Sequence, residues 1–136
     1  NVARMNAHTP ALIHGDATTT NFVYPWNDGV VAIDWERMKI TDPAADVGRL
    51  VAEITHSINT HGGSVAEALT LVEHLLDAYC RAAGHTADAR EQFIERVRFF
   101  RATSTLRIAR NGWVPRVART AMVAEALALL ADCTAW

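Results

Sequence analysis

The feature that most constrains the fold is a succession of helical patterns that fills the chain from residue 43 onward. Signals that begin or end helices separate these patterns. Asp42 and Pro43 are typical of a helix start, and Ser64 followed three residues later by Glu67 forms a capping box. The helices expected from these signals span residues 43–60, 64–83, 87–111 and 115 onward.

Apolar residues recur at helical spacing within these segments and predict the faces that pack together. In the third helix the predicted stripe consists of Phe93, Val97, Phe100 and Ser104. In the fourth helix it consists of Val117, Ala121, Ala124, Leu127 and Leu130.

A β-hairpin is expected ahead of the helices. The segment NFVYP (21–25) is β-branched and aromatic, the pair Asp28-Gly29 is typical of a tight turn, and VVAID (30–34) supplies a second strand. The segment WERMKIT (35–41) is expected only to connect this hairpin to the helices. The prediction is an α+β, mostly helical fold with one domain over 1–136, a motif-bearing segment at 11–42 and a helical body at 43–136.

Composition excludes several classes of function. A formal net charge of -2 argues against general nucleic-acid binding, and no apolar run is long enough to cross a membrane. No signal peptide is visible at the start of the sequence. Cys80 and Cys133 fall in helical patterns, which favours reduced thiols and a cytoplasmic location.

Candidate catalytic and metal-binding residues lie around the predicted hairpin. His14, Gly15 and Asp16 precede it, Asn21 begins its first strand, and Asp34 ends its second. A hairpin with these bounds places Asn21 and Asp34 at the same end, within reach of Asp16. Two carboxylates and an amide oxygen form a hard-oxygen cluster that suits Mg²⁺ rather than zinc.

The order and spacing of these motifs resemble the protein-kinase-like phosphotransferases, specifically the aminoglycoside phosphotransferase and choline kinase group. H-G-D followed by four residues and Asn resembles their catalytic loop. VAIDWE (31–36) resembles the strand that ends in the metal-binding acid, and TDPAADVGRL (41–50) resembles the segment after it. The resemblance covers residues 11–55 and implies the C-terminal lobe of a protein-kinase-like fold.

The resemblance also implies roles for single residues. Asp16 would accept or orient the proton of the acceptor hydroxyl, while Asn21 and Asp34 would hold Mg²⁺ at the phosphates of ATP. His14 and Asp46 would support the catalytic loop.

The implied acceptor is a hydroxyl of a small molecule, whether aminoglycoside-like, choline-like or other. Trp35 and Glu36 are candidates to line its pocket. Gly15 stands where protein kinases carry Arg, and only five residues separate Glu36 from Asp42. Both features disfavour a protein kinase regulated by phosphorylation of an activation loop.

The chain also departs from the family pattern. ATTT (17–20) follows the H-G-D motif, and no Gly-rich loop or strand lysine precedes it; Lys39, the only lysine, lies after the metal acid. We therefore expect the nucleotide-binding N-terminal lobe to be absent from these residues and this chain alone to be inactive. Helices that normally precede the catalytic loop are expected to be absent as well, so the apolar surface that they would cover should be exposed and promote self-association.

Two other functions remain open from the sequence. The chain could be a degenerate kinase lobe that serves as a binding module, or a Mg²⁺-dependent hydrolase. The arginines of the third helix could form a docking face, but nearby glutamates favour a solvated face. Those arginines are Arg90, Arg96, Arg98, Arg101, Arg107 and Arg110.

Overall fold

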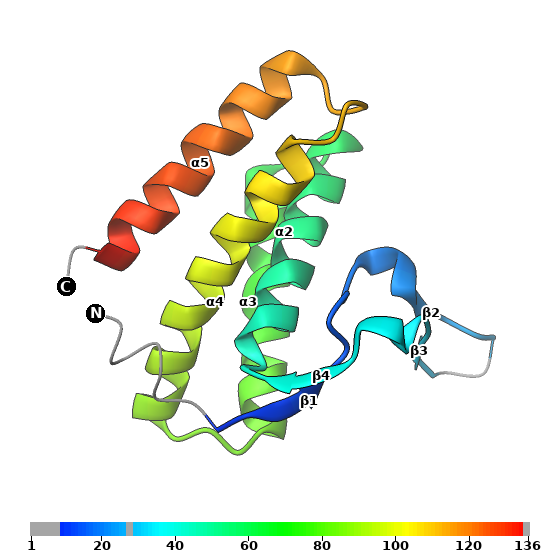
Figure 1. Ribbon diagram of the computed structural model, residues 1–136, viewed down its shortest axis with the longest axis vertical. Coiled ribbons are helices and arrows are strands. Elements are labelled where there is room, and N and C mark those ends of the chain that lie inside the picture. Colours follow the sequence, from blue (N-terminus) through cyan, green and yellow to red (C-terminus); the bar gives the residue numbers. More distant parts are fainter. Residues whose placement is uncertain (1–8, 27–28, 135–136) are drawn as a thin grey trace.

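The computed structural model describes residues 9–26 and 29–134. Within these ranges a small β region is followed by four helices (Figure 1). The strands are β1 (Ala11–Ile13), β2 (Phe22–Val23), β3 (Val31–Ala32) and β4 (Lys39–Thr41), with short 3-10 turns η1 (Thr19–Asn21) and η2 (Trp35–Arg37). The helices are α2 (Ala44–Thr60), α3 (Val65–Ala82), α4 (Ala87–Ala109) and α5 (Arg116–Thr134). The predicted α+β, mostly helical fold is confirmed.

The helix boundaries follow the local signals. Both halves of the capping box are formed at α3, since the side chain of Ser64 accepts from Glu67 N–H and Glu67 accepts from Ser64 N–H. At α2 the Asp42 Oδ1 accepts a hydrogen bond of 3.0 Å from the backbone N–H of Ala44. Each of these side chains satisfies a backbone donor that a helix start leaves free.

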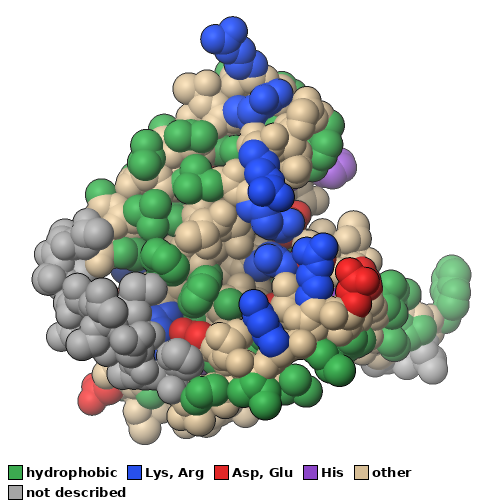
Figure 2. All heavy atoms as spheres, viewed as in Figure 1, with side chains coloured by type: hydrophobic (Ala, Val, Ile, Leu, Met, Phe, Trp, Pro, Cys, Tyr) green, Lys and Arg blue, Asp and Glu red, His purple; other side chains and the backbone are tan. Residues whose placement is uncertain are grey.

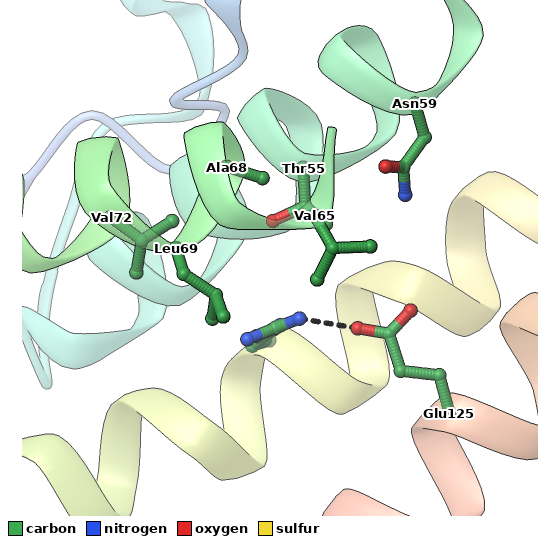
Figure 3. Close-up of a pocket in the computed structure, with 8 residues that line it drawn as sticks. Thr55, Asn59, Val65, Ala68, Leu69, Val72 and Glu125 are labelled. Atoms are coloured by element: carbon green, nitrogen blue, oxygen red, sulfur yellow. Dashed lines mark hydrogen bonds and ion pairs between the residues drawn. The ribbon is translucent and has the colours of Figure 1, made fainter. Parts of the chain in front are cut away.

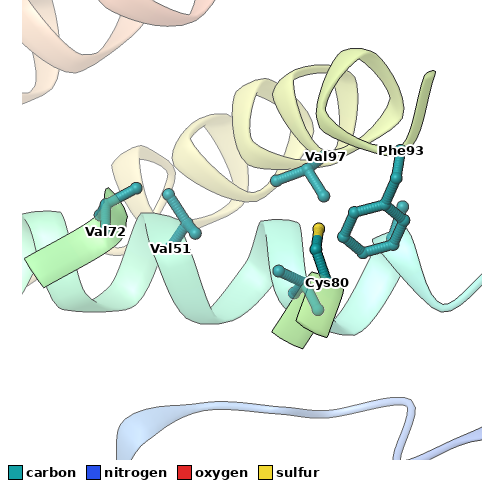
Figure 4. Packing of buried hydrophobic residues seen from close by; sticks show 7 residues of the cluster. Val51, Val72, Cys80, Phe93 and Val97 are labelled. Carbon is teal, nitrogen blue, oxygen red and sulfur yellow. The ribbon is translucent and has the colours of Figure 1, made fainter. Parts of the chain in front are cut away.

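The helical core lies where α2, α3 and α4 meet. Figure 4 shows Val51, Val72, Cys80, Phe93 and Val97 directed into the same space from these three helices. Partly buried Leu75, Leu76, Tyr79 and Phe100 pack around this cluster. In α4 the predicted stripe is confirmed, since Phe93, Val97 and Ser104 are buried and Phe100 is partly buried.

Gly48 allows α2 and α4 to approach closely. A Cβ atom at this position would lie 2.6 Å from Phe100 Cβ and 2.8 Å from the carbonyl oxygen of Val97. Only a residue without a side chain fits at this crossing, and α2 is therefore fixed against α4 at the level of its second turn.

The strand pair of the predicted hairpin is present but shorter than expected, and the predicted turn at Asp28-Gly29 includes a residue outside the described ranges. β2 pairs antiparallel with β3 in the register Phe22↔Ala32 and Val23↔Val31. The ladder ends before Asp34, whose φ of 64° places it in the left-handed region. Asp is one of the residues that tolerate this conformation.

A second pair of strands corrects the sequence-based expectation. β1 pairs antiparallel with β4, with Leu12 opposite Ile40. The end of the WERMKIT segment is therefore a strand and not only a connection. Two short segments about 28 residues apart in sequence pair here, and local patterns carry no information about such a partner.

The expected solvated face of α4 is wrong for Arg96, Arg101 and Arg107, whereas Arg90, Arg98 and Arg110 are exposed. Arg96 is buried and paired with Asp42, while Arg101 pairs with Glu125 and Arg107 with Glu53. Arg90 forms an exposed pair with Asp77 of α3. These charges link α4 to its neighbours, because their acidic partners come from other elements and not from α4 itself.

The predicted stripe of α5 is also wrong. Val117 and Leu127 are 84% and 58% exposed, and Ala121 and Ala124 are exposed as well. Val114 before α5, together with Ala118 and Met122, packs instead against Ala52 and Ile108. Apolar residues surround α5 on several sides, so its sequence does not select one face.

Two further findings bear on the class of protein. None of the helices in residues 9–26 and 29–134 combines the length and apolar character that crossing a membrane requires. Both cysteines are described, and they are free thiols, with Cys80 buried and Cys133 partly buried.

Candidate active site

The loop between β1 and β2 carries the H-G-D motif and is held by the first turn of α2. Asp46 Oδ2 accepts a hydrogen bond of 2.6 Å from the backbone N–H of His14, and Oδ1 accepts one of 3.0 Å from Gly15 N–H. One carboxylate thus satisfies two successive backbone donors of the loop. Since each bond to a charged acceptor is stronger than a neutral one, Asp46 firmly anchors the loop.

Gly15 is required by the backbone at this point. Its φ is 81°, and a Cβ atom there would overlap the backbone carbonyl of Arg37. The loop therefore passes directly over η2, and a larger residue would push the two segments apart.

His14 connects the loop to the segment that leads to Asp34. Its ring is buried, and Nδ1 accepts a hydrogen bond of 3.3 Å from the backbone N–H of Asp16. Nε2 lies 2.7 Å from the carbonyl oxygen of Ile33. A carbonyl can only accept, so Nε2 carries the proton and donates. Both ring nitrogens therefore form hydrogen bonds to the backbone, one to Asp16 and one to Ile33.

Asp16 lies at the surface end of this loop with its carboxylate between two arginines. Arg49 Nη1 donates to Asp16 Oδ1 and, at 2.7 Å, to the carbonyl oxygen of Gly15. Arg37 Nη1 lies 3.8 Å from Asp16 Oδ2. The side chain of Asp16 is 20% exposed, so its carboxylate remains open to a molecule that approaches from solvent.

Asn21 and Asp34 lie at the same end of the hairpin. The backbone N–H of Ile33 donates to the carbonyl oxygen of Asn21 at 3.0 Å, which places Asp34 one residue from this contact. Asn21 Nδ2 donates to the carbonyl oxygen of Asp16 at 3.0 Å. This bond orients the amide so that Asn21 Oδ1 is the group left for a ligand. The structure thus brings the segments of Asp16, Asn21 and Asp34 together.

The oxygens present fit a magnesium ion that shares its coordination with phosphates. Asn21 Oδ1 and the exposed carboxylate of Asp34 are hard ligands, and Mg²⁺ is commonly held by one or two protein oxygens while phosphates and water complete its shell. Within the described residues no three His, Cys, Asp or Glu side chains gather into a complete metal site. The donor set therefore suits a metal that arrives with a phosphorylated ligand better than a permanently bound ion.

Trp35 and Glu36 occupy η2 beside this loop. The Trp35 ring centroid lies 4.7 Å from that of His14, and its Nε1 donates to the carbonyl oxygen of Ala32 at 2.8 Å. The ring is half-exposed, while Glu36 is exposed and lies 3.6 Å from Arg37 Nε. Trp35 packs against the loop and still presents a free face to solvent.

Arg49 lies among charged side chains of both signs. Burial lowers the pKa of its guanidinium, the charge of Arg107 lowers it further, and the carboxylates of Asp16 and Asp46 oppose this change. An arginine stays charged at neutral pH even so. Figure 2 shows that Lys and Arg side chains gather in a band on one face of the molecule. Negatively charged ligands are favoured near such a band.

A separate pocket lies between α2, α3, α4 and α5 (Figure 3). Its floor includes the ion pair between Arg101 and Glu125, beside Val65 and Leu69. None of the residues expected at the active site lines this pocket. It does not belong to the site around Asp16.

The sequence-based interpretation did not include Arg49 or Arg37. A signal for Arg49 was available, because it follows Asp46 by three residues and such residues share one face of a helix. A helix that holds the loop through Asp46 therefore also directs Arg49 toward it. No local pattern indicated Arg37, since its approach depends on the path of η2.

A sequence model of the phosphotransferase enzyme family, the group of aminoglycoside phosphotransferase-like proteins, matches residues 2–94 of the chain. The match includes the loop, the hairpin, α2 and α3. Comparisons with curated proteins and with solved structures found no significant match.

Proposed function

We propose that this chain, which belongs to the phosphotransferase enzyme family, is the C-terminal catalytic lobe of an enzyme that transfers the terminal phosphate of Mg-ATP to a hydroxyl of a small molecule. The observation that supports this most directly is the convergence of one loop and one hairpin end. It supports the proposal because the segments of Asp16, Asn21 and Asp34 meet there, in the order along the chain that kinase-like phosphotransferases use.

In this proposal Asp16 accepts or orients the proton of the acceptor hydroxyl. The hydroxyl oxygen forms a bond to the terminal phosphorus while the bond from that phosphorus to the oxygen of ADP breaks. The hydroxyl proton passes toward Asp16. Positioning of the two reactants supplies much of the rate, and the anchored loop provides it.

Asn21 and Asp34 would hold the magnesium ion. When bound, Mg²⁺ neutralises charge on the phosphate oxygens. His14 and Asp46 keep the loop in place through the backbone contacts described above. Trp35 and Glu36, beside the loop, are proposed to contact the acceptor.

The nucleotide would be gripped by a lobe that is not among these 136 residues. Neither a Gly-rich loop nor a lysine ahead of the H-G-D motif is present in the sequence to clamp the phosphates. We therefore propose that this chain alone has no appreciable kinase activity. A cytoplasmic location, where ATP is abundant and the two thiols stay reduced, is part of the same proposal.

The test begins with the mass of the protein as its native cell makes it, measured with an antibody against this chain. The protein of that native length is then assayed with radiolabelled ATP, Mg²⁺ and a panel of hydroxylated small molecules. We expect transfer to at least one acceptor, and we expect Asp16→Asn to reduce it by about 10² or more.

The matched control is Asp77→Asn, the same change in an acid that pairs with Arg90 away from the site. Its transfer rate should equal that of the wild type. Absence of transfer by the wild type, or equal rates for Asp16→Asn and Asp77→Asn, contradicts the proposal. Phosphate release from simple esters without nucleotide would favour a hydrolase, and retained partner binding in Asp16→Ala and Asp34→Ala variants would favour a binding module.

A further inference from the structure

We propose that Arg49 is a positioning residue that fixes one oxygen of Asp16 and leaves the other for the acceptor hydroxyl. This inference rests on the proposed function. A single nitrogen, Arg49 Nη1, contacts both Asp16 Oδ1 and the carbonyl oxygen of Gly15. It therefore restrains the side chain of Asp16 and the backbone just before it at the same time.

The backbone of Arg49 is held in a fixed position on α2. Asp46 and Arg49 lie one turn apart on α2, and both form hydrogen bonds to the same loop, Asp46 as an acceptor and Arg49 as a donor. Asp46 accepts from two backbone N–H groups, and Arg49 donates to one backbone carbonyl. Between these two residues, Gly48 packs so closely against α4 that there is no space for a Cβ atom. Since α2 cannot slide, the position of the guanidinium is set by the helix packing.

The two oxygens of Asp16 consequently differ. Oδ1 is occupied by Arg49, whose side chain is only 20% exposed. Oδ2 faces Arg37, which lies 3.8 Å away and is 60% exposed. An exposed surface arginine at this distance yields easily to a ligand. The geometry therefore directs Oδ2 toward the acceptor.

The experiment uses the protein of native length with Mg-ATP and water as the acceptor, so that phosphate release is the readout without knowledge of the natural acceptor. We expect Arg49→Ala to lower kcat by about 10- to 100-fold, because a small displacement of a catalytic group has an effect of this size. The KM for ATP should change less than about twofold, since Arg49 has no nucleotide-binding role in the proposal. Added guanidinium ion should restore part of the rate.

Arg101→Ala is the matched control. Arg101 has the same 20% exposure and a similar ion pair, with Glu125, but it contacts no residue of the loop. It should lose stability without losing kcat and without responding to guanidinium. If Arg49→Ala does not fold, Arg49→Lys replaces it, and partial activity with a lowered kcat is the expected result.

The outcomes separate the two proposals. A rate lowered by Asp16→Asn but unchanged in Arg49→Ala would overturn the role of Arg49 alone. No effect of Asp16→Asn would overturn the proposed function. A fall in kcat for Arg49→Ala that guanidinium does not relieve, accompanied by an equal fall for Arg101→Ala, would mean a purely structural role and would also overturn the inference.

Discussion

Arg96 Nε donates a hydrogen bond of 2.9 Å to Asp42 Oδ2, and both side chains are almost fully buried. The other oxygen of Asp42 accepts from the N–H of Ala44 at the start of α2. This pair therefore joins α4 to the helix start that lies just before Asp46. The position of the H-G-D loop depends on it through α2.

Removal of Arg96 should strongly destabilise the protein. Arg96→Ala removes the guanidinium that pairs with the buried carboxylate of Asp42, and loss of one partner of a buried pair costs about 3–5 kcal/mol of the free energy of unfolding. Urea denaturation followed by circular dichroism measures this. Arg98→Ala, two residues away and exposed, should stay within about 0.5 kcal/mol of the wild type. Equal effects of the two substitutions would show that the buried pair does not stabilise the fold.

Gly48→Ala should destabilise the protein although alanine favours helices. The substitution gains about 1 kcal/mol in helix propensity. The added Cβ would meet Phe100 and the backbone of α4 at 2.6–2.8 Å, and overpacking of this kind costs about 1–3 kcal/mol. The melting temperature should therefore fall. Thr103→Ala on the exposed side of α4 is the control, and an increase in stability for Gly48→Ala would contradict the prediction.

Alkaline pH should weaken the fold through Cys80. Burial raises the pKa of this thiol in the folded state, and burial also raises the pKa of the neighbouring Tyr79 hydroxyl. Above about pH 8.5, the ordinary pKa of a thiol, the unfolded chain loses the proton that the folded chain keeps. The unfolded state then binds fewer protons, so the free energy of unfolding decreases as pH rises.

Urea denaturation between pH 7 and pH 10 tests this for the wild type and for Cys80→Ala. The variant is expected to be less stable throughout because it leaves a cavity, but its stability should fall less steeply with pH. Parallel curves for the two proteins would show that Cys80 does not contribute to the pH dependence.

The isolated chain should self-associate through the β1–β4 sheet. Leu12 and Ile40 are cross-strand neighbours, and they are 64% and 74% exposed. Exposed apolar pairs on a short two-stranded sheet favour association. Light scattering at increasing concentration should show species larger than a monomer, and the double variant Leu12→Lys, Ile40→Lys should reduce them. Val117→Lys, an exposed apolar site on α5, is the control. A monomeric wild type at high concentration would contradict the prediction.

The local signals in the sequence determined the helices and the order of the site motifs. Ser64 and Glu67 formed the predicted cap because the two residues satisfy each other's backbone within one turn. The hairpin also depends on short-range information, since β2 and β3 lie close together in the sequence. The family pattern from His14 to Asp46 could also be read directly, because the order of residues along the chain preserves it.

Only the tertiary structure decided which distant residues meet. The pairing of β1 with β4, the burial of Arg96 on Asp42 and the contact of Arg49 with Asp16 all join residues at least 26 positions apart. The face of α5 that packs was likewise set by α2 and α4, because α5 is apolar on several sides. Each of these contacts depends on close packing between elements, and the sequence pattern of one element does not indicate which other element it will pack against.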